Sequence, residues 1–209
     1  MSGEPQARWG IALGVGFGGA LLVASTVGHM IPPERNLLGG FGLGLVYLGP
    51  FALAAIAQRV ASGPTRAGIL WGAGLAGGLL AFTSLSGVGL PLVIPSGLLI
   101  AAGARAGRES GGRVAATALG VILVTAAAAT LMLTMGGGRC WDRTLAPGGS
   151  VWVERPYRTS IGGGPEVIEG HCSSWVPSAN ASLLSASVWV VGGAILLTAG
   201  GRRPVEVEA

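Results

Sequence analysis

The fold class is decided by residues 67–104, AGILWGAGLAGGLLAFTSLSGVGLPLVIPSGLLIAAGA, a stretch of 38 residues without a charged side chain. As one helix this stretch would measure about 57 Å at 1.5 Å per residue, nearly twice the hydrocarbon thickness of a bilayer, which is about 30 Å. We therefore expect it to fold back once, giving one membrane span up to about Ser86 and a shorter one over residues 88–104. The turn falls at residues that disfavour a continuous helix, namely Ser84, Ser86, Gly87, Gly89 and Pro91.

Four further uncharged stretches have the length of a membrane span. They are residues 9–28, 37–57, 114–135 and 183–200. Only 11% of the chain is charged, against about 25% in an ordinary soluble domain, and the mean hydropathy is +0.64. This composition excludes a water-soluble fold and a disordered chain. The sequence predicts an all-α integral membrane protein with six transmembrane helices arranged as three hairpins.

The longest polar connection separates the fifth predicted helix from the sixth. It divides the chain into a five-helix membrane region (1–135), an extracytoplasmic loop (136–182) and a sixth helix with a cytoplasmic tail (183–209). Within the membrane region, residues 8–22 share an arginine and several glycines with residues 66–80. An internal duplication of a helical hairpin and a chance match within a composition rich in Gly, Ala and Leu both explain this similarity.

Arginine placement predicts the orientation of the helices. All 13 basic residues are Arg, which together with abundant Ala and Gly indicates a GC-rich bacterial genome. Basic residues in short loops favour the cytoplasmic side. With the N-terminus inside, the short cytoplasmic segments contain Arg8, Arg59, Arg66, Arg105, Arg108, Arg113, Arg202 and Arg203. The sequence thus predicts a multi-pass protein of the inner (plasma) membrane with both termini in the cytoplasm, and a retained first helix is favoured over a cleaved signal peptide.

Cys140 and Cys172 both fall in the extracytoplasmic loop when the chain has this orientation. Disulfides persist in oxidising compartments, so we expect a bond between these two cysteines. We favour this bond over a zinc site that includes His171, because the loop has no C-x-x-C or H-x-x-x-H spacing.

The same loop has the composition of a small β-structure. Residues 150–157 are predicted to form a strand that pairs with residues 166–175 through a turn at residues 162–165. Three tryptophans lie in the loop, at Trp141, Trp152 and Trp175. They are either anchors for a protein partner or an interfacial belt with a miniature core, and we favour the belt because loop ends next to a bilayer collect Trp.

The predicted spans contain no Asp, Glu, Lys, Arg or His. Ionisable groups inside a helical bundle are the usual sign of proton or ion coupling, so a proton-coupled pump is disfavoured. The chain also has no Walker A motif, and we predict no catalytic residue, no cofactor and no metal site. A pairing of His29 with Ser84 or Ser86 is the one arrangement that resembles a serine protease, and a structural role for this interfacial histidine is favoured over it.

Glycines recur every four residues in several spans, as at Gly10, Gly14 and Gly18. Such stripes let helix backbones approach closely, and packing within the chain is favoured over a dimer face. Residues 14–19 and 72–77 also spell G-x-G-x-x-G, but neither follows a strand, so they do not predict a dinucleotide site. Kinks are predicted at the three prolines inside spans, Pro50, Pro91 and Pro95.

These features predict a non-enzymatic membrane protein that presents an ordered outer loop to a protein partner or stabilises a membrane complex. The alternative is a small permease or channel-like transporter subunit without its own proton-coupling residues or ATPase. The expected partners are the lipid bilayer and a protein bound through the outer loop. Nucleic acid is not an expected partner, because the arginines punctuate apolar runs and do not cluster on one face. The sequence does not specify an oligomeric state.

Overall fold

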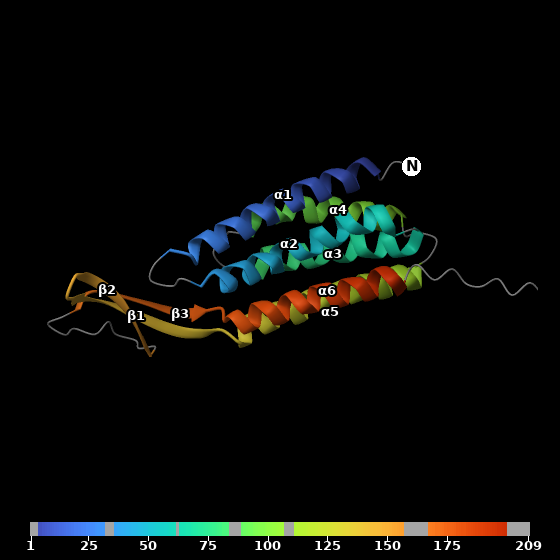
Figure 1. Cartoon of the computed structure of the whole chain (residues 1–209). Coiled ribbons are helices and arrows are strands. Elements are labelled where there is room, and N and C mark those ends of the chain that lie inside the picture. The colour runs from blue at the N-terminus through green and yellow to red at the C-terminus, as the bar shows by residue number, and fades with distance from the viewer. Residues whose placement is uncertain are drawn as a thin grey trace, which may run out of the picture.

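The computed structural model describes residues 4–31, 36–61, 63–83, 89–106, 111–156 and 167–199. The helices are α1 (Glu4–Gly28), α2 (Leu37–Val60), α3 (Gly63–Thr83), α4 (Val93–Ala106), α5 (Gly111–Thr134) and α6 (Ala179–Ala199), with a 3₁₀ turn, η1 (Leu90–Leu92), directly before α4. The strands are β1 (Gly137–Ala146), β2 (Gly149–Pro156) and β3 (Val167–Val176). Figure 1 shows the helices side by side in one bundle and the strands in a small sheet at one end of it.

Five of the described helices, all except α4, are long and apolar enough to cross a membrane. The chain is therefore predominantly helical and has the character of a multi-pass membrane protein. The fourth predicted span is shorter, because η1 and α4 together cover only Leu90–Ala106. A count of six spans and the orientation of the termini remain predictions, and the predicted turn at residues 84–88 lies outside the described residues.

The three span prolines do not play the same role. Pro50 lies inside α2, as predicted. Pro91 lies in η1, and Pro95 lies in the first turn of α4. The first turn of a helix has backbone N–H groups without helical acceptors, so a proline there removes no hydrogen bond. Pro91 and Pro95 therefore lie where the 3₁₀ and α-helical segments begin, and the kinks expected at these two prolines stay a prediction.

Glycine stripes bring the helix backbones together inside the bundle. On α1, Gly10, Gly14 and Gly18 are buried and face α2 and α4. On α3, a Cβ atom at Gly72 would lie 2.7 Å from the carbonyl oxygen of Ala118 in α5. Packing within the chain, which the glycine spacing predicted, is thus confirmed for these stripes. Both G-x-G-x-x-G matches lie within helices, one in α1 and the other in α3.

The core of the bundle is apolar and includes Phe51, Ile69, Leu99 and Val121, all of which are fully buried. Large apolar side chains also cover the outside of the bundle. The most exposed include Phe82, Leu133, Val190 and Ile195. Lipid is as apolar as these side chains, so close packing of small residues and not the hydrophobic effect holds such helices together.

The three strands form an antiparallel sheet in the order β2-β1-β3. Strands at residues 150–157 and 166–175 were predicted, and β2 and β3 largely match them. The prediction that these two strands pair with each other was wrong, because β1 lies between them and pairs with both. The predicted connection at residues 162–165 lies outside the described residues.

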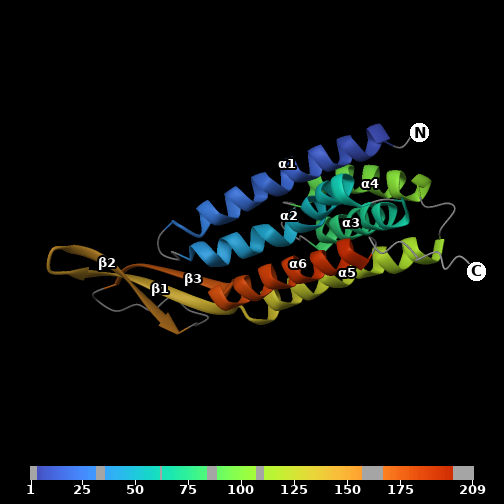
Figure 2. The ribbon, with the colours of Figure 1, turned by 45° about the vertical axis from the view of Figure 1, so that its right-hand side comes forward.

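The sheet extends the bundle along its long axis (Figures 1 and 2). Strand β1 follows α5 almost directly, and β3 leads through Pro177 and Ser178 into α6. With 10 residues at about 3.3 Å per residue, β1 is about 33 Å long. The sheet is therefore an arm whose base is continuous with two helices and whose far end is the β1–β2 turn.

Candidate functional site

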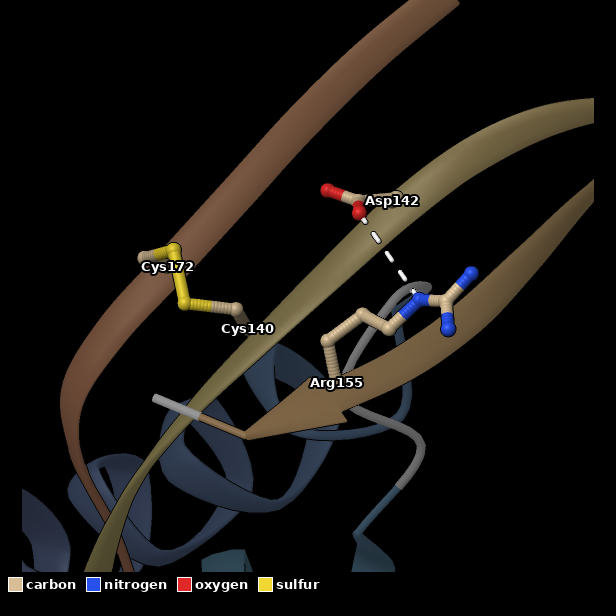
Figure 3. The surroundings of a disulfide bond; sticks show 4 residues. All are labelled: Cys140, Asp142, Arg155 and Cys172. Atoms are coloured by element: carbon tan, nitrogen blue, oxygen red, sulfur yellow. Dashed lines mark ion pairs between the residues drawn. A yellow bond between two sulfur atoms is a disulfide. The ribbon is translucent and has the colours of Figure 1, made fainter. Parts of the chain in front are cut away.

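A disulfide between Cys140 and Cys172 links the central strand to β3. The two residues are directly opposite one another in the register, with their Cα atoms 4.1 Å apart (Figure 3). The bond closes a loop with a sequence separation of 32 residues, for which chain entropy gives a stabilisation of about 3 to 4 kcal/mol. Because each sulfur is bonded to the other, neither is a thiolate, and a thiolate is the form of cysteine that binds zinc.

One face of the sheet carries a buried carboxylate beside the disulfide. Residues two apart on a strand point to the same face, so Asp142 lies on the same face as Cys140. Its side chain is only 5% exposed, and one carboxylate oxygen lies 3.9 Å from Nε of Arg155 on β2 (Figure 3). The two charges attract one another across the β1–β2 pair, and their attraction supports the register that the disulfide fixes on the other side of β1.

The opposite face of the sheet is built around Trp141. This side chain is buried and faces His171 on β3, with the ring centroids 5.9 Å apart. Ion pairs flank it on the same face, one joining Arg139 to Glu154 at 2.8 Å and the other joining Arg143 to Glu169 at 3.7 Å. Trp141 therefore belongs to the packing of the sheet itself and is not a free anchor for a partner.

The far end of the sheet has a different character, because its large side chains are apolar and exposed. Leu145, Val151 and Ile168 are 69%, 47% and 55% exposed. Leu145 and Val151 lie next to the β1–β2 turn, on opposite faces of the sheet, because Val151 pairs with Thr144 and not with Leu145. Ile168 is the second residue of β3. We call these three residues the apolar tip.

A tight turn places the apolar tip at the end of the arm. Gly148 and Gly149 have φ angles of +105° and +136°, values that residues with a Cβ atom rarely adopt. Interpretation of the sequence placed the only hairpin turn at residues 162–165 and so missed this one. The signal was present in Pro147-Gly148-Gly149, which follows directly after Ala146.

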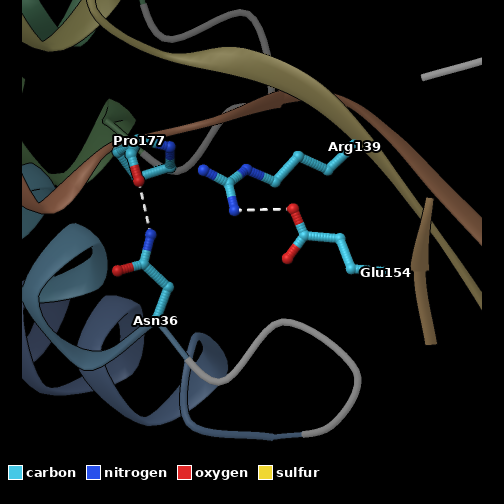
Figure 4. A network of polar contacts seen from close by, with 4 residues as sticks. All are labelled: Asn36, Arg139, Glu154 and Pro177. Carbon is cyan, nitrogen blue, oxygen red and sulfur yellow. Dashed lines mark hydrogen bonds and ion pairs between the residues drawn. The ribbon is translucent and has the colours of Figure 1, made fainter. Parts of the chain in front are cut away.

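The base of the sheet is joined to the bundle by Asn36, another residue that the sequence did not single out. Its side-chain oxygen accepts a hydrogen bond from the backbone N–H of Gly39 and caps the N-terminus of α2. Its side-chain nitrogen donates a hydrogen bond to the carbonyl oxygen of Pro177, between β3 and α6 (Figure 4). One side chain thus fixes the start of α2 and the start of α6 to one another.

His29 lies close to this junction and has a structural environment. Its Nδ1 atom lies 2.8 Å from the carbonyl oxygen of Ser25, to which it donates. The hydroxyl of Ser25 donates in turn to the carbonyl oxygen of Gly40 on α2, at 2.8 Å. Ser84 and Ser86, the serines predicted as possible partners of His29, lie outside the described residues. In the part of the chain that the structure describes, no three His, Cys, Asp or Glu side chains are grouped so that they could hold a metal ion.

Most hydroxyls in the helices bond back to their own backbone. The hydroxyl of Thr125, for example, donates to the carbonyl oxygen of Val121 at 2.8 Å, as is usual inside helices. Three buried groups differ, because Ser96 Oγ, Ser185 Oγ and Trp189 Nε1 have no hydrogen-bond partner among the described residues.

Comparisons with family models, with curated proteins and with solved structures find no match to this chain.

Proposed function

We propose that this chain is a non-enzymatic protein of the bacterial inner membrane whose sheet docks a partner protein outside the cytoplasm. The apolar tip carries the proposal. Its three side chains are exposed at the end of an arm about 33 Å long that a disulfide braces. Leu145 and Val151 point to opposite faces of the sheet, so the end of the arm is apolar on both sides. Exposed apolar surface of this kind marks interaction sites in many proteins. A rigid arm also loses little conformational entropy on binding, which favours affinity.

The orientation follows from the arginines. Six spans, with η1 and α4 as the fourth, place both chain termini in the cytoplasm and the sheet outside. An oxidising compartment is also the one in which the Cys140–Cys172 bond persists. Reporter fusions at Ser62, Gly107 and the C-terminus are expected to give a cytoplasmic signal. A periplasmic signal at any of them would reject this arrangement.

Docking through the apolar tip is tested by photo-crosslinking in the cell that makes the protein. A photoreactive amino acid at Val151 is expected to give one adduct of defined mass, and the same side chain at the exposed Pro156, on the same strand near the base, is the matched control. Replacing Leu145 and Ile168 by Asp should abolish the adduct because the docking surface becomes charged. If the photoreactive amino acid at Val151 gave no adduct, or gave the same adducts as at Pro156, docking at the apolar tip would be rejected.

The buried hydroxyl of Ser96 supports a second function, that of a small permease or channel-like subunit. Ser96 is 2% exposed, and its Oγ lies close to Gly77 of α3 inside the bundle. Neutral polar groups at such depth are compatible with passive passage of a small polar solute, and they supply no proton coupling. Solute flux into vesicles containing the purified protein, reduced by Ser96→Val, would favour this function over docking. Absence of flux would leave docking as the better account.

A further inference from the structure

Helices α2 and α6 run parallel and pack in a fixed register. A Cβ atom at Gly42 would overlap Ser182, one at Gly49 would overlap the indole ring of Trp189, and one at Gly193 would lie 3.5 Å from Leu53. The two members of each of these pairs are separated by the same number of positions in the sequence. The same offset places Ser185 at the level of Leu45 on α2, one residue before Val46.

Two hydrogen-bond donors of α6 lie in this interface. Ser185 is completely buried, the Nε1 atom of Trp189 is buried, and neither donates to any residue that the structure describes. They are four positions apart and so lie on one face of the helix. The contrast with Ser187 is direct, since its exposed hydroxyl donates to the carbonyl oxygen of Leu183 at 2.8 Å. A buried hydrogen-bond donor without an acceptor lowers the stability of the fold. Two such donors close together therefore require an acceptor between the helices.

An acceptor is available on α2 at the same level. Pro50 lies inside α2 and has no N–H to donate to the carbonyl oxygen of Val46, one turn earlier. Val46 is 3% exposed and packs in the same apolar cluster as Trp189. Carbonyl groups released by proline in membrane helices are satisfied by neighbouring helices, by hydroxyls or by ordered water.

We infer that Ser185, Trp189 and the Val46 carbonyl group form a binding site for a single water molecule between α2 and α6. A water accepts two hydrogen bonds and donates two, so the two donors of α6 and the released carbonyl satisfy three of its four positions. All three protein groups are neutral, which suits water and not an ion. The water connects α2 to α6 through two buried donors that have no partner among the described residues and through a carbonyl group that Pro50 leaves without its usual helical donor.

The test uses the full-length protein in detergent micelles with ¹⁵N-labelled tryptophan. The indole N–H signal of Trp189, assigned by its loss in Trp189→Phe, is expected to show a magnetisation-transfer cross-peak from a long-lived water and slow exchange into D₂O. Ser185→Ala should shift this signal, remove the cross-peak and lower the melting temperature. Ser187→Ala, the matched control on the lipid-facing side of the same helix, should do none of these. Pro50→Ala restores the missing backbone N–H and should also remove the cross-peak.

Three results would overturn the inference. One is a Trp189 signal without a water cross-peak in the unaltered protein. Another is fast exchange of the indole proton, which would mean that bulk water reaches it. The third is a melting temperature that rises in Ser185→Ala relative to Ser187→Ala, because removal of an unsatisfied hydroxyl stabilises a protein. Since Ser185→Ala removes a single oxygen atom, it leaves the helix packing intact and the result interpretable.

Discussion

In the helical bundle, neighbouring backbones approach so closely that glycine is required at the contacts. In the sheet, by contrast, a disulfide and ion pairs between the described strands hold together a structure with little apolar interior. Gly72 of α3 lies against the backbone of α5, and this contact gains dispersion energy without any charged group. Cys140 and Cys172, by contrast, restrain the sheet through a covalent bond. Each region should therefore respond to changes that leave the other region unaffected.

Among the single substitutions, one that fills a helix contact should destabilise the protein most. A Cβ atom at Gly103 of α4 would lie 2.7 Å from the backbone nitrogen of Trp71 in α3, whereas Gly97, on the same helix, has open space around it. Gly103→Leu is therefore expected to lower the free energy of unfolding by about 3 kcal/mol, and Gly97→Leu should leave it nearly unchanged. Unfolding followed by circular dichroism measures both, and the disulfide should stay intact throughout. Equal stability of the two variants would show that close packing does not hold the bundle.

An intermediate effect is expected at the junction between the two regions. Asn36→Ala removes both the cap of α2 and the hydrogen bond to Pro177, which we expect to cost about 1 to 2 kcal/mol. Asn36→Asp keeps the capping oxygen and loses only the donor. Hydrogen exchange should therefore show a frayed α2 start in the first variant alone and a loosened start of α6 in both. Asn180→Ala, at an exposed position in α6, is the control. If the hydrogen-exchange profile of Asn36→Ala were the same as that of Asn180→Ala, the role of Asn36 would be contradicted.

The smallest effect is expected from the ion pairs of the sheet. Arg139 and Glu154 are each about half exposed, so solvent and salt screen their attraction and we expect a coupling energy under about 1 kcal/mol. A double-mutant cycle with Arg139→Gln and Glu154→Gln measures this coupling energy. The quantity compared among the variants is the dithiothreitol concentration at which half of the disulfide is reduced. The coupling should decline as salt is added. A coupling that salt does not change would show that this pair is shielded from solvent.

The long helices could be predicted from the sequence because membrane spans have a strong local signal. An uncharged run of about 20 residues is rare outside a membrane, and arginines mark its ends. The fourth helix was harder to define, since its beginning is set by Pro91 and Pro95 at the start of helical segments. Proline occurs both in the first turn of a helix and at kinks inside a helix, so its presence in the sequence did not distinguish these two positions.

Strand β1 could not be recognised from its own residues. It contains Arg139, Asp142 and Arg143 among its 10 positions, and both of its faces carry charged groups, so it lacks the alternation of apolar and polar residues that predicts a strand. The Asn36–Pro177 contact is beyond sequence reasoning for another reason. Its two residues are 141 positions apart, and no local pattern relates them. Cys140 and Cys172 were paired correctly because the chain contains just two cysteines.

The most direct test of separate stabilisation is hydrogen exchange followed by mass spectrometry, on the intact protein with and without dithiothreitol. Reduction of Cys140–Cys172 removes about 3 to 4 kcal/mol of restraint from the sheet and touches no helix contact. We predict that exchange accelerates in peptides from β1, β2 and β3 while peptides from α1 to α6 keep their protection. Faster exchange in the helices, or unchanged exchange in the strands, would contradict the account.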